Sequence, residues 1–230
     1  MEKSLYPFAK QWDMGSGIYF YSDPHFADDE MKHLRHNYIG DEEQVKRINQ
    51  KVGKKGTLVI LGDIGDVEWV KKIRGYKVLV MGNHDAGATN YKRISQPEQV
   101  EWERHYDPHY YALGPNQFRG EYISTKKVVQ EAQDNHLFDE VYEGPLFISE
   151  KILLSHEPIS LPYIFNIHGH DHGGSHNEGA QSLNMCAELI DYTPVSLNDI
   201  IKKGYLKHIE SIHRITINEA ARKSKKKESK

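Results

Sequence analysis

Three short apolar runs in the first third of the chain each stop abruptly at polar residues. The runs at 17–22, 57–61 and 76–81 predict buried strands. Helical patterns lie between them, around 41–52 and 69–73. This alternation of strands and helices is typical of an α/β layered domain. Ligands bind such sheets beyond the carboxyl ends of the strands, so the polar residues after each run are the first candidates for a site.

The longer of the two helices is expected to begin at Asp41. Asp41 and Gln44 resemble a capping box, and Val45, Ile48 and Val52 then fall on one helical face. Strand-like runs resume in the second half of the chain at 137–142, 146–149, 152–154, 163–168 and 182–186, before a final helix near 196.

Residues 86–136 break this pattern. The stretch is polar and aromatic, its helical periodicity is weak, and it is too long for a simple connection. We therefore expect one domain over residues 1–221 that carries an insertion or cap at 86–136. The basic run at 222–230 favours a solvated, disordered tail over a nucleic-acid-binding arm.

Composition argues against several classes of protein. A formal net charge of −3 argues against broad electrostatic adhesion to nucleic acid. No stretch approaches the roughly 18 consecutive apolar residues of a membrane span. The N-terminal residues have no apolar core of signal-peptide length, so we expect a cytoplasmic protein without a membrane partner. Cys186 is the only cysteine, which excludes a disulfide framework and a cysteine-rich zinc site.

Residues that can bind metal ions follow the predicted strands. Carboxylate oxygens, imidazole nitrogens and one amide oxygen form a mixed set, which suits Mn²⁺, Fe or Zn²⁺ better than Ca²⁺ or Mg²⁺. Seven candidate ligands are too many for one tetrahedral ion but suit two neighbouring ions that share a carboxylate. The candidate ligands are Asp23, His25, Asp63, Asn83, His156, His170 and His172, with His84 and Asp85 beside them.

The spacing of these residues supports a common site. Asp23 and His25 are two residues apart, so on an extended segment their side chains project to the same side. His170 and His172 repeat that spacing. In three places a glycine stands just before a candidate ligand, which allows a tight turn and close backbone approach. These glycines are Gly62, Gly82 and Gly169.

Five short motifs follow one another along the chain. They are Asp-x-His at 23–25, Gly-Asp at 62–63, Gly-Asn-His-Asp at 82–85, His156 before Glu-Pro, and Gly-His-x-His at 169–172. In this order they closely resemble the calcineurin-like metallophosphoesterase superfamily, over roughly residues 17–196 outside the segment 86–136. The resemblance implies a four-layer sandwich of two mixed β-sheets flanked by helices, which agrees with the predicted strands.

The resemblance also implies a role for each matched residue. The first ion would be held by Asp23, His25 and His172, and the second by Asn83, His156 and His170, with Asp63 as the bridge. His84 would face the scissile phosphate, and Asp85 would orient it. The implied reaction is hydrolysis of a phosphoric mono- or diester by a hydroxide that bridges two divalent ions. Mn²⁺ is the first expectation for those ions, with Fe, Zn, Ni or Co as alternatives.

The sequence departs from the protein phosphatases of this superfamily at two points. Those enzymes carry an arginine directly after Gly-Asp-x-x-Asp and end the later motif in glutamate. Here Val67 follows Asp66, and Asp85 ends the later motif. We therefore expect a small prokaryote- or phage-type phosphoesterase that acts on a small phosphorylated substrate or a nucleotide. Asp66 is interpreted as a helix cap or a neighbour of the ligands, and His168 as a packed strand histidine.

The insertion is expected to set specificity, since loops on a rigid scaffold carry recognition. Arg93, Arg104 or Arg119 could contact substrate phosphate, and Tyr110 or Tyr111 could stack on a base or sugar. The stronger alternative is an insertion with its own small aromatic core and solvated arginines. Two rival functions are a nuclease that acts on DNA or RNA and a catalytically silent scaffold. The acidic balance counts against the nuclease, and the complete set of matched residues counts against the scaffold. The oligomeric state stays open.

Overall fold

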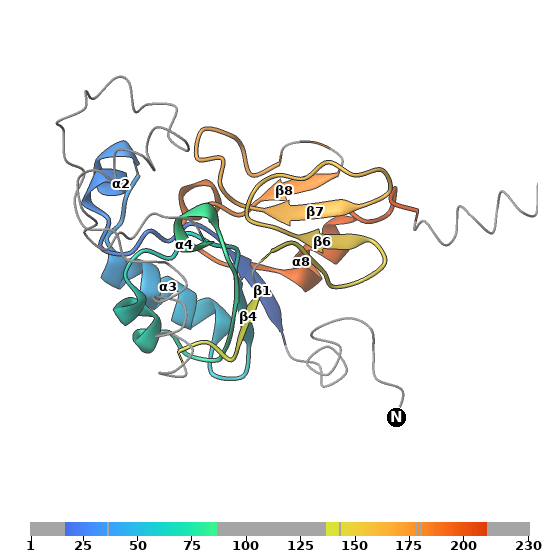
Figure 1. The fold of residues 1–230 in the computed structure, drawn as a ribbon. Coiled ribbons are helices and arrows are strands. Elements are labelled where there is room, and N and C mark those ends of the chain that lie inside the picture. The colour runs from blue at the N-terminus through green and yellow to red at the C-terminus, as the bar shows by residue number, and fades with distance from the viewer. Residues whose placement is uncertain are drawn as a thin grey trace, which may run out of the picture.

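Two mixed β-sheets form the centre of the chain in the computed structural model (Figure 1). The structure describes residues 17–35, 37–86, 137–142, 144–177, 179 and 181–210. The strands of the first sheet are β1 (Ile18–Tyr21), β2 (Thr57–Ile60), β3 (Tyr76–Val80), β4 (Glu140–Tyr142) and β9 (Val195–Ser196). Their order is β4-β3-β2-β1-β9, with β1 to β4 parallel and β9 antiparallel to β1.

The second sheet is smaller and also mixed. Its strands are β5 (Leu146–Phe147), β6 (Ile152–Leu154), β7 (Phe165–His168) and β8 (Ser182–Asn184). Strands β6, β7 and β8 are parallel, and β5 pairs antiparallel with β6. Parallel pairing places the carboxyl ends of neighbouring strands at the same edge of each sheet.

The main core lies between the two sheets. Phe20, Val59 and Val78 are in register on three neighbouring strands and are fully buried. They belong to one apolar cluster with Phe165 and Ile167 of the second sheet. Successive side chains of a strand point to opposite faces, so the residues between them are directed to the other side of the first sheet.

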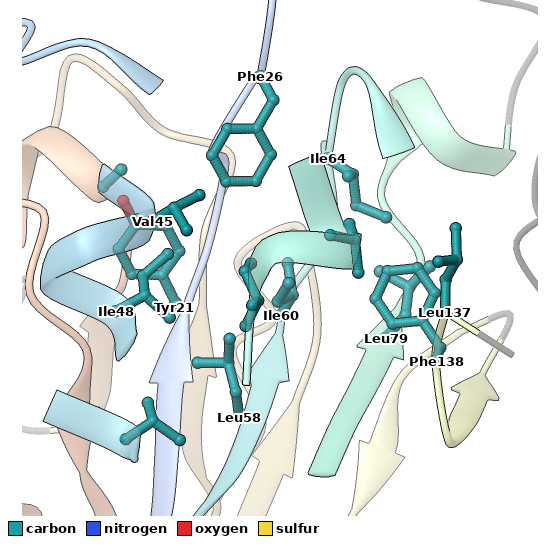
Figure 2. Close-up of a cluster of buried hydrophobic side chains, with 14 of the residues drawn as sticks. Tyr21, Phe26, Val45, Ile48, Leu58, Ile60, Ile64, Leu79, Leu137 and Phe138 are labelled. Carbon is teal, nitrogen blue, oxygen red and sulfur yellow. The ribbon is translucent and has the colours of Figure 1, made fainter. Parts of the chain in front are cut away.

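A helical layer covers that other side. The described helices are α2 (Asp29–Leu34), α3 (Asp41–Val52), α4 (Asn83–Ala86) and α8 (Leu197–Lys203), with 3₁₀ turns η1 (Val67–Lys72) and η2 (Ala187–Ile190). Residues of α3, η1 and η2 pack on that other side, whereas Leu197 and Ile200 of α8 belong to the cluster between the sheets. Val45 and Ile48 of α3 pack in a second cluster with Tyr21, Leu58 and Ile60 of the first sheet (Figure 2). In Figure 1, α3 lies on one side of β1 and strands β6 to β8 lie on the other.

The start of α3 differs from the expected capping box, which is wrong. The N-cap is Gly40, at φ 87°, and no side chain caps the N-terminus of the helix through a hydrogen bond. The Asp41 carboxylate instead accepts hydrogen bonds from the Ala27 amide at 3.1 Å and the Tyr38 hydroxyl at 2.6 Å. Gln44 accepts from the buried Tyr21 hydroxyl at 2.9 Å. Tertiary partners have taken both side chains, so neither is left to cap the helix.

The expected α/β fold with two mixed sheets is confirmed. Helix α3 packs on the first sheet, and α8 lies beside β1 and β9 with Leu197 and Ile200 in the cluster between the sheets. The fourth layer over the second sheet stays an expectation. Residues 87–136 of the expected insertion and the tail at 222–230 lie outside the described residues. Within the described ranges, no helix is long and apolar enough to cross a membrane.

Candidate metal centre

The loops after β1 and β2 run side by side beyond the strands, because backbone hydrogen bonds continue between them. The Asp23 amide donates to the Gly62 carbonyl at 3.1 Å, and the His25 amide donates to the Asp63 carbonyl at 3.1 Å. In the second sheet, the Gly169 amide donates to the His156 carbonyl at 2.8 Å. The polar residues at the strand ends are therefore held by backbone pairing.

Two glycines make room for close approach. A Cβ on Gly62, which has φ +92°, would lie 2.6 Å from the Gly82 backbone and 2.6 Å from His156 Nδ1. A Cβ on Gly169 would lie 1.9 Å from Ser22 Oγ and 2.2 Å from Asp23 Oδ2. No side chain fits at either position, which explains the glycines that precede the candidate ligands.

Four candidate ligands have left-handed backbone conformations. The φ angles are 54° at Asp23, 45° at His25, 52° at Asp63 and 69° at His170. Such conformations cost a non-glycine residue about 1–3 kcal/mol each and cluster at functional sites. The fold carries this strain at the point where these side chains are brought together.

The first group of donor atoms surrounds Asp23 and is buried. His25 Nε2 lies 3.9 Å from Asp23 Oδ1 and 3.6 Å from Asp63 Oδ2. His172 Nε2 approaches Asp23 Oδ1 to 3.5 Å from the second sheet. The other Asp23 oxygen accepts the His170 amide at 3.0 Å and the Cys186 thiol at 3.3 Å.

The second group surrounds His156. His156 Nε2 lies 2.7 Å from Asn83 Oδ1, 3.1 Å from His170 Nδ1 and 3.4 Å from Asp63 Oδ2. His170 Nδ1 is also 3.1 Å from Asn83 Oδ1. One donor atom from each of Asp63, His156 and His170 can be chosen so that all lie within 4.8 Å of one another, which is close enough to hold one ion. The same holds for Asp23, His25 and Asp63.

Asp63 belongs to both groups. Its Oδ2 is 3.6 Å from His25 Nε2 and 3.4 Å from His156 Nε2, so one carboxylate oxygen faces both sides. Its Oδ1 accepts the His84 amide at 2.9 Å, which fixes the orientation of the carboxylate.

Three histidines have their Nδ1 atoms engaged by oxygen acceptors. His156 Nδ1 lies 2.8 Å from the Leu61 carbonyl, His25 Nδ1 lies 3.2 Å from Asp28 Oδ2, and His172 Nδ1 contacts Glu188 Oε1. Because a carbonyl or ionised carboxylate only accepts, each Nδ1 carries the proton, and in the neutral ring the Nε2 lone pair then faces the aspartates. Metal-binding histidines are commonly fixed in this way.

Two buried atoms of the candidate ligands also lack hydrogen-bond partners. They are Asp23 Oδ1 and His25 Nε2, which face each other across the first group. Leaving buried polar atoms unpaired costs free energy, and a bound cation would remove that cost. The residues present therefore fit divalent metal ions.

Sequence reasoning missed three residues that support the ligands. Asp28 contacts His25 and also caps α2 by accepting the Met31 amide at 3.1 Å. Glu188 contacts His172 and forms an ion pair with Arg35 at 3.3 Å. Arg35 in turn donates to the Asp23 carbonyl at 2.6 Å. The spacing of Asp28 from His25 was a usable signal, whereas Glu188 lies far along the chain with no local signal.

His84 and Asp85 occupy different surroundings. His84 is half exposed, with Nε2 3.9 Å from Asp63 Oδ2, and its ring lies edge-on to His25 at a centroid distance of 5.4 Å. Asp85 is buried, and its carboxylate accepts three backbone amides, from Asp63 at 2.8 Å, Gly82 at 3.0 Å and Ile64 at 3.2 Å. Burial raises the pKa of Asp85, and the three amides counteract it.

These bonds give Asp85 a structural role, and its expected part in orienting His84 stays a prediction. Its oxygens join the loop after β2 to the loop after β3, so it is positioned to hold those loops in place. The three backbone donors by themselves account for an aspartate at this position. The family resemblance implied that Asp85 orients His84, and no sequence pattern indicated the three buried amide donors around it.

The remaining interpretations have clear outcomes. Asp66 caps η1 by accepting the Glu68 amide at 3.0 Å, and His168 is fully buried in β7, as expected. Cys186, buried against Asp23, was not among the candidates, and burial raises the pKa of its thiol. The proposed substrate contacts lie outside the described residues and stay predictions, namely Arg93, Arg104, Arg119, Tyr110 and Tyr111.

Metal binding should release protons near neutral pH. Burial disfavours charge on His156, but contact with Asp63 and the charge of Asp23 outweigh it and raise its pKa to about 9 without metal. Glu188 likewise outweighs burial and raises the pKa of His172. A ligand nitrogen must lose its proton before it binds a cation, so metal affinity should rise with pH and level off above about pH 9.

Calorimetric titration of metal-free protein with Mn²⁺ or Zn²⁺ at about pH 7, in two buffers of different ionisation enthalpy, measures the protons released. We expect about one proton or more per chain. An affinity that does not change between about pH 6 and pH 8, with no proton release, would contradict the assignment of His156 as a ligand.

Comparison with known proteins gives one structural likeness. No family model matches the chain, and no curated protein matches it. The fold is similar to the crystal structure of a protein of unknown function from Aquifex aeolicus, with a TM-score of 0.50 and 22% sequence identity. The match covers 82% of this chain and 99% of that chain. At this identity the likeness concerns the fold alone.

Proposed function

We propose that this protein hydrolyses phosphoric esters with the help of two divalent metal ions. The observation that carries the proposal is the shared Asp63 oxygen, which faces His25 on one side and His156 on the other. A single ion needs no such shared carboxylate, whereas two-metal hydrolases depend on one to keep their ions close together.

The donor atoms divide between two ions. Asp23, His25 and His172 would hold the first, and Asn83, His156 and His170 the second, with Asp63 between them. Ions held in this way would supply charge neutralisation for a phosphate group and lower the pKa of a water molecule. The mixture of carboxylate, amide and imidazole donors favours Mn²⁺, Fe or Zn²⁺.

His84 would serve the leaving group. It is half exposed beside Asp63, so it lies between the buried donors and solvent, where an ester would enter. In hydrolysis a water oxygen bonds to phosphorus, the ester P–O bond breaks, and the departing alcohol oxygen needs a proton. His84 Nε2–H would donate that proton and would regain one from water after the alcohol leaves.

Metal-stripped protein should have no esterase activity until a divalent ion is added. Mn²⁺, Zn²⁺, Ni²⁺ or Mg²⁺ would be added back and assayed with paired chromogenic phosphate mono- and diesters. We expect Mn²⁺ to restore hydrolysis, with two ions per chain by elemental analysis. The ester that is hydrolysed faster would then show whether the protein prefers monoesters or diesters.

Two results would contradict the proposal. If two ions bind tightly and no ester is hydrolysed, the site is a structural centre on a silent scaffold. If no ion binds, the convergence of carboxylates and imidazoles has another purpose. Cleavage of single-stranded DNA or RNA but not of small esters would favour the nuclease instead.

A further inference from the structure

A cavity of about 220 Å³ opens directly beside the second group of donor atoms. Asn83 and His156 form part of its wall, so a phosphate held by these residues would border the cavity. An ester of that phosphate must place its alcohol portion somewhere next to the site. This cavity provides such a space among the described residues.

Most of the cavity wall is apolar. Met81, Pro145 and Ile159 supply that surface, and the single acidic residue among the lining residues is Glu157. The described lining residues include no lysine or arginine. The positive charge of the adjoining metal centre would already be paired with the phosphate that it holds and with the aspartates. A second phosphate or a carboxylate in this space would lie beside Glu157 with no lysine or arginine in the described lining to offset it, whereas an apolar or cationic group would be accepted.

The wall that carries Glu157 is held in place. The Ser155 hydroxyl donates to the Glu157 carbonyl at 2.6 Å and accepts from Asn166 Nδ2 at 2.9 Å. The Ile159 amide donates to Asn166 Oδ1 at 2.8 Å. A single buried asparagine of β7 thus fixes both ends of the segment 155–159, so the cavity is preformed.

The size of the cavity limits its occupant. Pockets for drug-sized ligands span about 300–1,000 Å³, so this cavity suits something smaller, on the scale of one ring. We propose that it binds the alcohol portion of the substrate and selects small phosphate esters whose alcohol is apolar or cationic over those whose alcohol is anionic. This inference rests on the proposed function of the adjoining metal centre.

The charge selection can be tested with two aryl phosphates that differ in one substituent. One substrate is 4-(aminomethyl)phenyl phosphate and the other is 4-carboxyphenyl phosphate. The ratio of their kcat/KM values is compared between variants, so that the intrinsic difference between the leaving groups cancels. Glu157→Gln should shift this ratio about tenfold toward the carboxylated ester. Glu150→Gln removes the same charge from an exposed turn outside the cavity and should leave the ratio unchanged.

The size selection uses Gly144, which lines the cavity. A Cβ at this position would meet no atom within 4 Å, so a side chain can be added here without a clash at its base. Because Gly144 lines the cavity, a large side chain is expected to narrow it. Gly144→Phe should raise the kcat/KM ratio of methyl phosphate to phenyl phosphate at least about tenfold.

The results separate the two proposals. If metal-loaded wild-type protein hydrolyses phenyl phosphate and neither variant moves its ratio, the cavity is not the alcohol site, and the esterase activity stands. If the wild-type protein hydrolyses no phosphate ester with any metal, the proposed function and this inference are both wrong.

Discussion

Asp63→Asn should abolish metal-dependent ester hydrolysis, with a loss of at least about 10³-fold in kcat/KM. One oxygen of the Asp63 carboxylate faces both sets of donor atoms, and an asparagine lacks the negative charge that would let this position serve two cations. We expect metal content to fall below two ions per chain. Elemental analysis and turnover with the better chromogenic ester measure both effects.

Asp66→Asn is the matched control for this substitution. Asp66 lies three residues further along, is exposed, and caps η1 through the Glu68 amide. Asparagine is as good a cap as aspartate, so stability and activity should stay close to those of the wild-type protein. Equal losses from both substitutions, or full activity in Asp63→Asn with two ions bound, would mean that no carboxylate bridge exists.

Asp85→Asn should lower the free energy of unfolding of the metal-free protein by about 3 kcal/mol. Both carboxylate oxygens accept buried backbone amides, and asparagine would place an NH₂ group against at least one of those donors. The backbone amide of Asp63 donates one of these hydrogen bonds, so the substitution should also disturb the position of this candidate ligand and lower the metal affinity. Urea unfolding followed by circular dichroism measures the stability.

Introducing Asp85→Asn into a His84→Ala variant distinguishes a structural role of Asp85 in holding the loops from a role in orienting His84. If Asp85 holds the loops, Asp85→Asn should cost the same free energy of unfolding with or without His84. If it acts by orienting His84, stability should barely change, and its effect on turnover should vanish once His84 is gone. Because Asp85 accepts three hydrogen bonds from backbone amides, we expect an equal loss of stability with and without His84.

The strands and the convergence of polar residues at their ends could be predicted because both signals are local. An apolar run that stops at Asp23 or Asp63 predicts a strand end, and parallel pairing then brings such ends together. Apolarity alone was less exact about strand boundaries. Leu137 and Phe138 were assigned to a strand, but they are core residues that precede β4.

What could not be predicted depends on partners remote in sequence. Glu188 supports His172 through a contact that only the packed sheets create, and no sequence pattern marks it. Asp41 was misread because it had a plausible partner in sequence and stronger partners in the fold. The three amides that Asp85 accepts likewise had no signal in the sequence. Short polar side chains bond to whichever donor the tertiary structure brings near.

The distribution of ligands along the chain bears on when the centre can form during synthesis. The hydrogen bond from the His170 amide to the Asp23 carboxylate joins residues 147 positions apart, and the candidate metal ligands come from both sheets. A nascent chain that has emerged only as far as β3 presents Asp23, His25 and Asp63 without the histidines of the second sheet. Closing so long a loop is costly until both sheets have docked. Two ions would therefore bind late, to a nearly finished fold, because a half-made chain offers at most the partial set of Asp23, His25 and Asp63.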